Sequence, residues 1–238
     1  MLMIFAILST GGCATTGDNG VWRRLVDSSH SSIKQKSVWV PLAAAAVLAA
    51  TSADREISEW AIEHQPVFGS TDNASDWSDW LSNGLVASAL ISSFVRRDDK
   101  YQPLVTDIFA LGGAYVYSSV VKGVAKRTRP DGTDDLSFPS LHATWAFSAA
   151  QITARQVSTL ETPYAGAIQA GLFTLASASA WARVEAARHY PSDVLVGAAI
   201  GNFFAGIGNA CLEKRKNVKV SYAPTQDGGE LRIQWLFR

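Results

Sequence analysis

The motif Lys122-Gly-Val-Ala-Lys-Arg-Thr-Arg129-Pro130 opens the stretch of sequence that decides the fold of this chain. Two further motifs follow it. The second is Phe138-Pro139-Ser140-Leu141-His142, and the third contains Arg183, His189 and Asp193. Together they concentrate two histidines, a carboxylate and several cations in a chain of which only 18% is charged. These are the residue types that transfer of a phosphoryl group through a histidine requires.

A phosphoryl group in transfer carries negative charge on its equatorial oxygens, which fixed cations and N–H donors stabilise. A neutral imidazole can attack the phosphorus, and a carboxylate on its other ring nitrogen would hold the required tautomer. We therefore predict that His189 is the nucleophile and that Asp193 orients it. His142 is predicted to protonate the leaving oxygen and later to activate water. The predicted phosphate cradle consists of three cations: Lys122, Arg129 and Arg183.

The spacing of these residues predicts their places on helices. Lys122 and Arg129 are seven positions apart, so one helix would bring both to the same face. A proline follows Arg129, which places that residue at the helix end. Pro191 is typical of a first helical turn, which puts Asp193 in that turn and His189 in the preceding loop.

At these internal spacings the motifs resemble the signature of the type-2 phosphatidic acid phosphatase superfamily, which includes bacterial acid phosphatases and vanadium haloperoxidases. That signature reads Lys-x6-Arg-Pro, then Pro-Ser-Gly-His, then Ser-Arg-x5-His-x3-Asp. The resemblance covers residues 80–212. Leu141 replaces the glycine of the signature and Ala182 replaces its serine. The positions that match are Lys122, Arg129, Pro130, Pro139, Ser140, His142, Arg183, His189 and Asp193.

The resemblance implies hydrolysis of a phosphate monoester or pyrophosphate of an envelope lipid through a phosphohistidine. It also implies that the Ser140 hydroxyl and the Leu141 N–H bind phosphate oxygens, and that vanadate inhibits. Leucine resists the positive φ that glycine tolerates and adds bulk, so Leu141 is expected to affect the fit of large head groups more than the chemistry. No metal cofactor is expected, because two histidines and scattered acids lack ligand spacing. The alternatives are a vanadium-dependent haloperoxidase, a phosphotransferase, or a non-catalytic phosphate-binding protein of the envelope.

The periodicity of the chain predicts an all-α fold, a bundle of about six helices with a small C-terminal β-hairpin. One helical domain over 37–215 suits a chain of 238 residues that is 47% hydrophobic, and the hairpin follows in 216–238. A net charge of zero argues against a nucleic-acid partner. The helices are expected at 37–53, 80–97, 103–127, 140–156, 162–188 and 191–213.

Residues 1–13 form an apolar run that ends in small residues and Cys13, which resembles a bacterial lipoprotein signal. Cys13 is then the lipidation site, residues 14–36 are a tether, and the active site faces the periplasm from a membrane. A secretory signal or a plain anchor is the alternative. Asp107 in the third predicted helix and a mean hydropathy of +0.07 favour a bundle that does not span the membrane. Long charge-free windows keep a spanning bundle as the competing interpretation.

Overall fold

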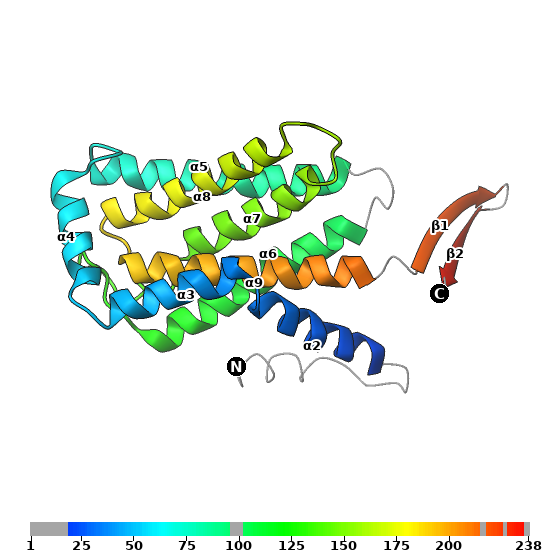
Figure 1. Cartoon of the computed structure of the whole chain (residues 1–238), viewed down its shortest axis with the longest axis horizontal. Coiled ribbons are helices and arrows are strands. Elements are labelled where there is room, and N and C mark those ends of the chain that lie inside the picture. Colours follow the sequence, from blue (N-terminus) through cyan, green and yellow to red (C-terminus); the bar gives the residue numbers. More distant parts are fainter. Residues whose placement is uncertain (1–18, 96–101, 215–217, 226–227, 236–238) are drawn as a thin grey trace.

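The computed structural model describes residues 19–95, 102–214, 218–225 and 228–235, so Cys13 and the predicted signal lie outside the described residues. In the described part the chain forms eight helices, most of them aligned along the long axis of the molecule (Figure 1). The all-α prediction is confirmed. The helices are α2 (Asn19–Ile33), α3 (Lys36–Ala49), α4 (Ala53–His64), α5 (Thr71–Val95), α6 (Gln102–Ala125), α7 (Leu141–Val157), α8 (Ala165–Glu185) and α9 (Pro191–Lys214).

Two of these helices were not expected from the sequence. Helix α2 lies inside the predicted tether, and the Ser32 hydroxyl near its end donates to the Phe203 carbonyl of α9 at 2.7 Å. Helix α4 lies in the predicted connection between the first two helices and turns by 90° from α3. It crosses one end of the bundle (Figure 1). The tether prediction therefore does not account for α2, which packs on α9.

Residues 218–235 contain two antiparallel strands, β1 (Val218–Thr225) and β2 (Gly228–Trp235), with Val218 opposite Trp235. They form a two-stranded sheet. The similarity to solved structures supports only the helical part of this fold. The predicted C-terminal hairpin therefore stays a prediction.

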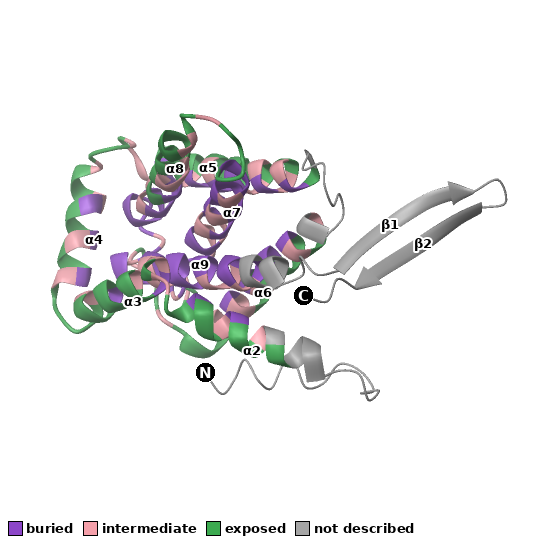
Figure 2. Cartoon of the chain, turned by 45° about the vertical axis from the view of Figure 1, so that its right-hand side comes forward, coloured by how far each residue is buried: buried purple, intermediate pink, exposed green. Residues whose placement is uncertain are grey.

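Helices α7 and α9 are the most extensively buried helices of the bundle (Figure 2). They pack closely because α9 presents glycines to the backbone of α7. A Cβ added at Gly197 would lie 2.4 Å from the Ser140 carbonyl oxygen, and one at Gly201 would lie 2.3 Å from that of Thr144. Small residues let two helix backbones approach in this way. The contact fixes the start of α9, which carries Asp193, against the start of α7.

The outer faces of α5 and α6 are apolar and exposed. Phe109 of α6 is 75% exposed, and Ile91 and Phe94 of α5 are also exposed. Asp107, by contrast, is fully buried, and both its oxygens lie 2.7 Å from Nη2 of Arg155 on α7. The charge of Asp107, which in the sequence argued against a membrane-spanning helix, is therefore paired with Arg155 inside the bundle. Leu104–Ala125 is long and apolar enough to cross a membrane, and the bent pair Lys36–Ala49 with Ala53–His64 passes the same test jointly.

Candidate active site

The three motifs meet at the end of the bundle that α4 crosses. Lys122 lies in the last turn of α6, Ser140 caps the start of α7, and Arg183 lies in the last turn of α8. Pro191 begins α9, with Asp193 in its first turn and His189 in the preceding loop, as predicted. Four helix ends thus bring together residues that are far apart in the sequence.

His189 is held by the loop that precedes α7. Its side chain is almost fully buried, and Nδ1 lies 2.5 Å from the Ser137 carbonyl oxygen. A carbonyl can only accept, so Nδ1 carries the proton and Nε2 keeps its lone pair. Burial, followed by the charges of Lys122 and Arg183, lowers the pKa of His189 well below its usual value. The imidazole is therefore neutral at neutral pH.

Asp193 does not make the predicted bond to His189; Nδ1 of that histidine faces Ser137 instead. Asp193 Oδ2 accepts from the Ser137 hydroxyl at 2.5 Å and from the Tyr190 N–H at 2.9 Å. These contacts hold the residues on both sides of the imidazole. Asp193 therefore positions His189 indirectly, through Ser137 and the backbone of Tyr190.

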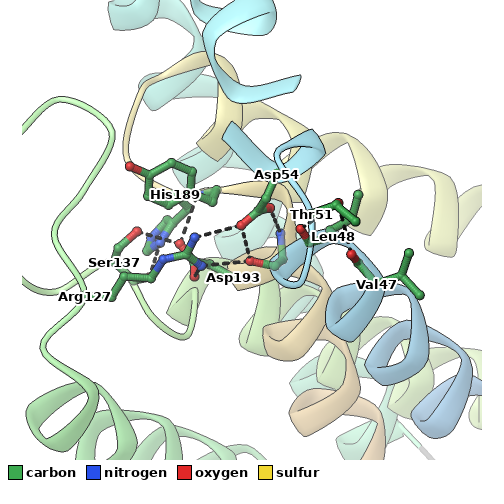
Figure 3. A network of polar contacts seen from close by, with 10 residues as sticks. Val47, Leu48, Thr51, Asp54, Arg127, Ser137, His189 and Asp193 are labelled. Carbon is green, nitrogen blue, oxygen red and sulfur yellow. Dashed lines mark hydrogen bonds and ion pairs between the residues drawn. The ribbon is translucent and has the colours of Figure 1, made fainter. Parts of the chain in front are cut away.

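Asp193 also belongs to a network of ion pairs in which both carboxylates are buried (Figure 3). Arg127 donates to Asp193 Oδ1 at 2.6 Å and to Asp54 Oδ2 of α4 at 2.7 Å. Asp54 also accepts from the N–H and the hydroxyl of Ser192, at 2.8 and 2.6 Å. One arginine therefore joins two buried carboxylates, and the network fastens α4 to the start of α9.

The predicted cations surround His189 from three segments. Helix α6 ends at Ala125, earlier than predicted, so Arg129 lies in the following loop and not on the same helical face as Lys122. Nζ of Lys122 donates to the Leu136 carbonyl. Arg129 Nε lies 2.7 Å from Asp134 Oδ1, an ion pair without hydrogen-bond geometry.

Arg183 is the most buried of the three cations. Its Nη1 donates to the Ser78 hydroxyl of α5 at 3.0 Å, and burial lowers its pKa to about 10, so it stays charged at neutral pH. Among the described residues, Arg183 Nε is buried without a hydrogen-bond acceptor. A buried donor of a charged group needs such a partner, and an anion in the cradle would supply one.

The second motif shapes the start of α7. The Ser140 hydroxyl accepts from the Ala143 N–H at 3.4 Å, and the Ser140 N–H donates to the Asp193 carbonyl at 3.1 Å. Leu141 is the first residue of α7 and is not among the residues with positive φ. The leucine therefore causes no backbone strain in place of glycine, and its N–H lies at a helix N-terminus, where anions are favoured.

His142 follows in the first turn of α7. Its Nε2 lies 2.6 Å from Oδ1 of Asp79, a residue of α5 outside all three motifs. Burial, followed by the charge of Arg183, lowers the pKa of His142 to about 4, and Asp79 acts in the opposite direction. The charges of Lys122 and Arg183 lower the pKa of both His142 and His189.

Residues 103–217 match the family described as the PAP2 superfamily. The predicted resemblance is thereby confirmed over this region, and the three motifs lie inside it.

The PAP2 fold also covers most of the chain. The structure is similar to that of a transmembrane PAP2 type phosphatidylglycerolphosphate phosphatase from Bacillus subtilis, with a TM-score of 0.59 and 20% identity over 83% of this chain and 96% of the other. A second similar structure is LpxE from Aquifex aeolicus, with a TM-score of 0.46 and 25% identity over 58% of this chain and 84% of the other. No curated protein sequence matches the chain. The likeness to the Bacillus subtilis structure establishes the PAP2 fold.

Several residues of the site were not predicted from the sequence. Ser137 and Arg127 lie within or beside the motifs, where their polar side chains were a visible signal. Asp54 and Asp79 lie between the helices predicted at 37–53 and 80–97, outside all three motifs. Both reach the site from helices that precede the motifs, so only the packing of α4 and α5 reveals them.

Among the described residues, no cluster of three or more His, Cys, Asp or Glu could hold a metal ion. The donor set at the site is dominated by cations, which suit an anion. Within the described residues, the arrangement provides a neutral imidazole whose Nε2 has no hydrogen-bond partner, three cations whose charges act on it, and a second histidine under the charges of Lys122 and Arg183.

Proposed function

We propose that this protein is a phosphatase that hydrolyses a lipid phosphate through a phosphohistidine intermediate, without a metal. The observation that supports this most directly is the buried Nε of Arg183, which has no acceptor among the described residues and whose charge acts on the neutral imidazole of His189. It fits a phosphate oxygen placed next to a nucleophile. The PAP2 family match and fold support the same reaction class.

In the proposed reaction, Nε2 of His189 attacks the phosphorus and the bond to the leaving oxygen breaks. His142 gives a proton to that oxygen, then takes one from the water that cleaves the phosphohistidine. Asp193 keeps the tautomer of His189 through Ser137. The phosphate oxygens are bound by the side chains of Lys122, Arg129, Arg183 and Ser140 and by the Leu141 N–H. Vanadate, which adopts five-coordinate geometry, is expected to inhibit.

An apolar groove beside the site supports a lipid as substrate. It has a volume of about 460 Å³ and lies between α5, α6 and α7. Trp145, one helical turn after His142, forms one wall and stacks on Tyr115 at 5.5 Å between ring centroids. From there the groove follows α6 away from the cradle. The remaining lining residues are Val86, Leu90, Ile108, Leu111, Gly112 and Val116.

The groove can be tested at Gly112. This glycine lines it, and a Cβ added there meets no atom within 4 Å, so leucine fits the helix and fills the groove. In wild type we expect kcat/KM for monomeric alkyl phosphates to rise with chain length, by about fourfold per methylene buried. Gly112→Leu should make kcat/KM less dependent on chain length. For the longer esters kcat/KM should fall by about 10-fold to 100-fold, equivalent to the loss of two or three methylene contacts.

The matched control is Gly171→Leu on α8, an exposed glycine with equal room for a Cβ and no place in the groove. It should keep the wild-type chain-length dependence. Assays run in excess chelator also test the metal. Phosphate release that needs an added metal, or a chain-length dependence that Gly112→Leu leaves intact, would contradict the respective part of the proposal.

We further propose that the helices themselves contact the membrane. Large apolar side chains are exposed on the outer faces of α5 and α6, as a lipid-facing surface requires, and Asp107 is paired inside the bundle. The structure therefore favours the spanning alternative over a tether alone. Lipidation of Cys13 and a periplasmic active site stay predictions from the sequence.

A chain that starts at Gly17 lacks Cys13 and the whole predicted signal. We expect it to remain in the membrane pellet after a high-pH carbonate wash, because the outer faces of the helices bury apolar surface in lipid. Release of the shortened chain into the wash, with full-length protein retained, would show that the N-terminus alone anchors the protein.

A further inference from the structure

The second histidine of the site has a partner outside the motifs. His142 Nε2 lies 2.6 Å from Oδ1 of Asp79, which projects from the third turn of α5. The aspartate side chain is 54% exposed and that of His142 is 31% exposed, so the pair lies at the open side of the site. Asp79 is also near enough to Arg183 to raise the pKa of that guanidinium.

We propose that Asp79 is a positioning residue that orients His142 and stabilises its protonated form, from which the proton is delivered to the leaving oxygen. This rests on the proposed function of the site. A carboxylate paired with an imidazolium forms a charge-assisted hydrogen bond, which is stronger than a neutral one. The pair also fixes the rotation of the His142 ring about its Cβ–Cγ bond, because Asp79 of α5 holds the ring nitrogen Nε2.

The charges around His142 explain why such a partner is needed. Two cations face it from different helices, Lys122 from α6 and Arg183 from α8, and burial disfavours its charged form further. These effects lower the pKa of His142, and an imidazole that is neutral has no proton to give at Nδ1 once Nε2–H is bonded to Asp79. Asp79 is the negative group that acts on His142 in the opposite direction.

The proton balance follows from the bond on Nε2. In the imidazolium, Nε2–H donates to Asp79 and Nδ1–H is left for the substrate. As the P–N bond to His189 forms, the P–O bond breaks, and its electron pair takes the Nδ1 proton. His142 is then neutral and still bonded to Asp79. Its Nδ1 accepts a proton from water as that water attacks the phosphohistidine, which restores the imidazolium.

The test is Asp79→Asn, assayed with two substrates of different leaving group. An alkyl phosphate needs its leaving oxygen protonated, whereas nitrophenyl phosphate releases a stable phenolate. We expect kcat/KM for the alkyl ester to fall by roughly 10-fold to 100-fold, within the range for general-acid catalysis. The nitrophenyl ester should change by less than about threefold, a small part of that range.

The pH profile gives a second readout with a definite sign. Removing the carboxylate removes the group that stabilises the imidazolium, so the pKa of His142 falls. The alkaline limb of the alkyl-phosphate profile should therefore move to lower pH in Asp79→Asn. Asp79→Glu should restore the wild-type position, and in a His142→Ala background Asp79→Asn should have no further effect.

The matched control is Asp76→Asn, an exposed aspartate one turn earlier on α5. It should behave as wild type. Equal losses on both esters, or an Asp79→Asn profile identical to wild type, would overturn the proposal. A rise in kcat/KM would also overturn it, since it would mean that the carboxylate competes with phosphate for His142 and Arg183. Absence of phosphate release by wild type would instead reject the proposed function itself.

Discussion

His189→Ala is expected to lower phosphate release by about 10⁴-fold or more, because the variant has no group that can form the covalent intermediate. Cations that only bind the substrate leave a residual rate above that of water. The measurement is steady-state phosphate release from one lipid phosphate and one alkyl phosphate, with the melting temperature of each variant recorded in the same detergent.

The control for this substitution is His64→Ala. His64 is exposed on α4, where its Nδ1 bonds the Trp60 carbonyl and its ring stacks on the Trp60 ring, with 5.2 Å between the ring centroids. That variant should turn over at the wild-type rate. Activity within about tenfold of wild type in a folded His189→Ala protein would contradict the role of His189, because loss of a nucleophile costs far more.

Asp54→Ala is expected to have the largest effect on stability. Asp54 is 4% exposed and accepts hydrogen bonds from Arg127 and from Ser192. Its removal leaves a buried N–H and hydroxyl without their acceptor and breaks one of the two ion pairs of Arg127. Breaking a buried pair costs about 3–5 kcal/mol; because Arg127 is about a third exposed, we expect about 2–4 kcal/mol.

The Arg55–Glu59 pair on the same helix provides the comparison. Its atoms are 3.8 Å apart and both side chains are largely exposed, so Glu59→Ala should lower stability by at most about 1 kcal/mol. Thermal unfolding of the two variants beside wild type tests this. Similar melting temperatures for Asp54→Ala and Glu59→Ala would show that the network of Figure 3 does not hold α4 to the site.

The motif residues could be predicted from the sequence because their spacing is local. Arg183, His189 and Asp193 lie within eleven positions, and the proline at 191 fixes where the helix begins. The hydrogen-bond partner of each side chain could not be predicted in the same way. The bond of His189 goes to a main-chain carbonyl, at Ser137, and carbonyls are present at every residue, so no sequence pattern marks the one that accepts.

Contacts between distant helices account for the other differences. From the sequence, Asp107 argues against a membrane-spanning helix. In the structure it is paired with Arg155, which lies 48 positions later in the chain. Asp79 and His142 are 63 positions apart and meet only because α5 packs beside α7. Helix α4 was not predicted, and its Asp54 carboxylate finds its partners only in distant segments, at Arg127 and at Ser192 of α9.

The central claim, a covalent phosphohistidine at position 189, is tested most directly by trapping. Wild-type protein is mixed with a labelled lipid phosphate in excess chelator, quenched in alkali, in which phosphohistidine survives, and digested for mass spectrometry. We predict label on the peptide that contains His189, with none in His189→Ala. Turnover without label on that peptide, or equal label in His189→Ala, would contradict the account.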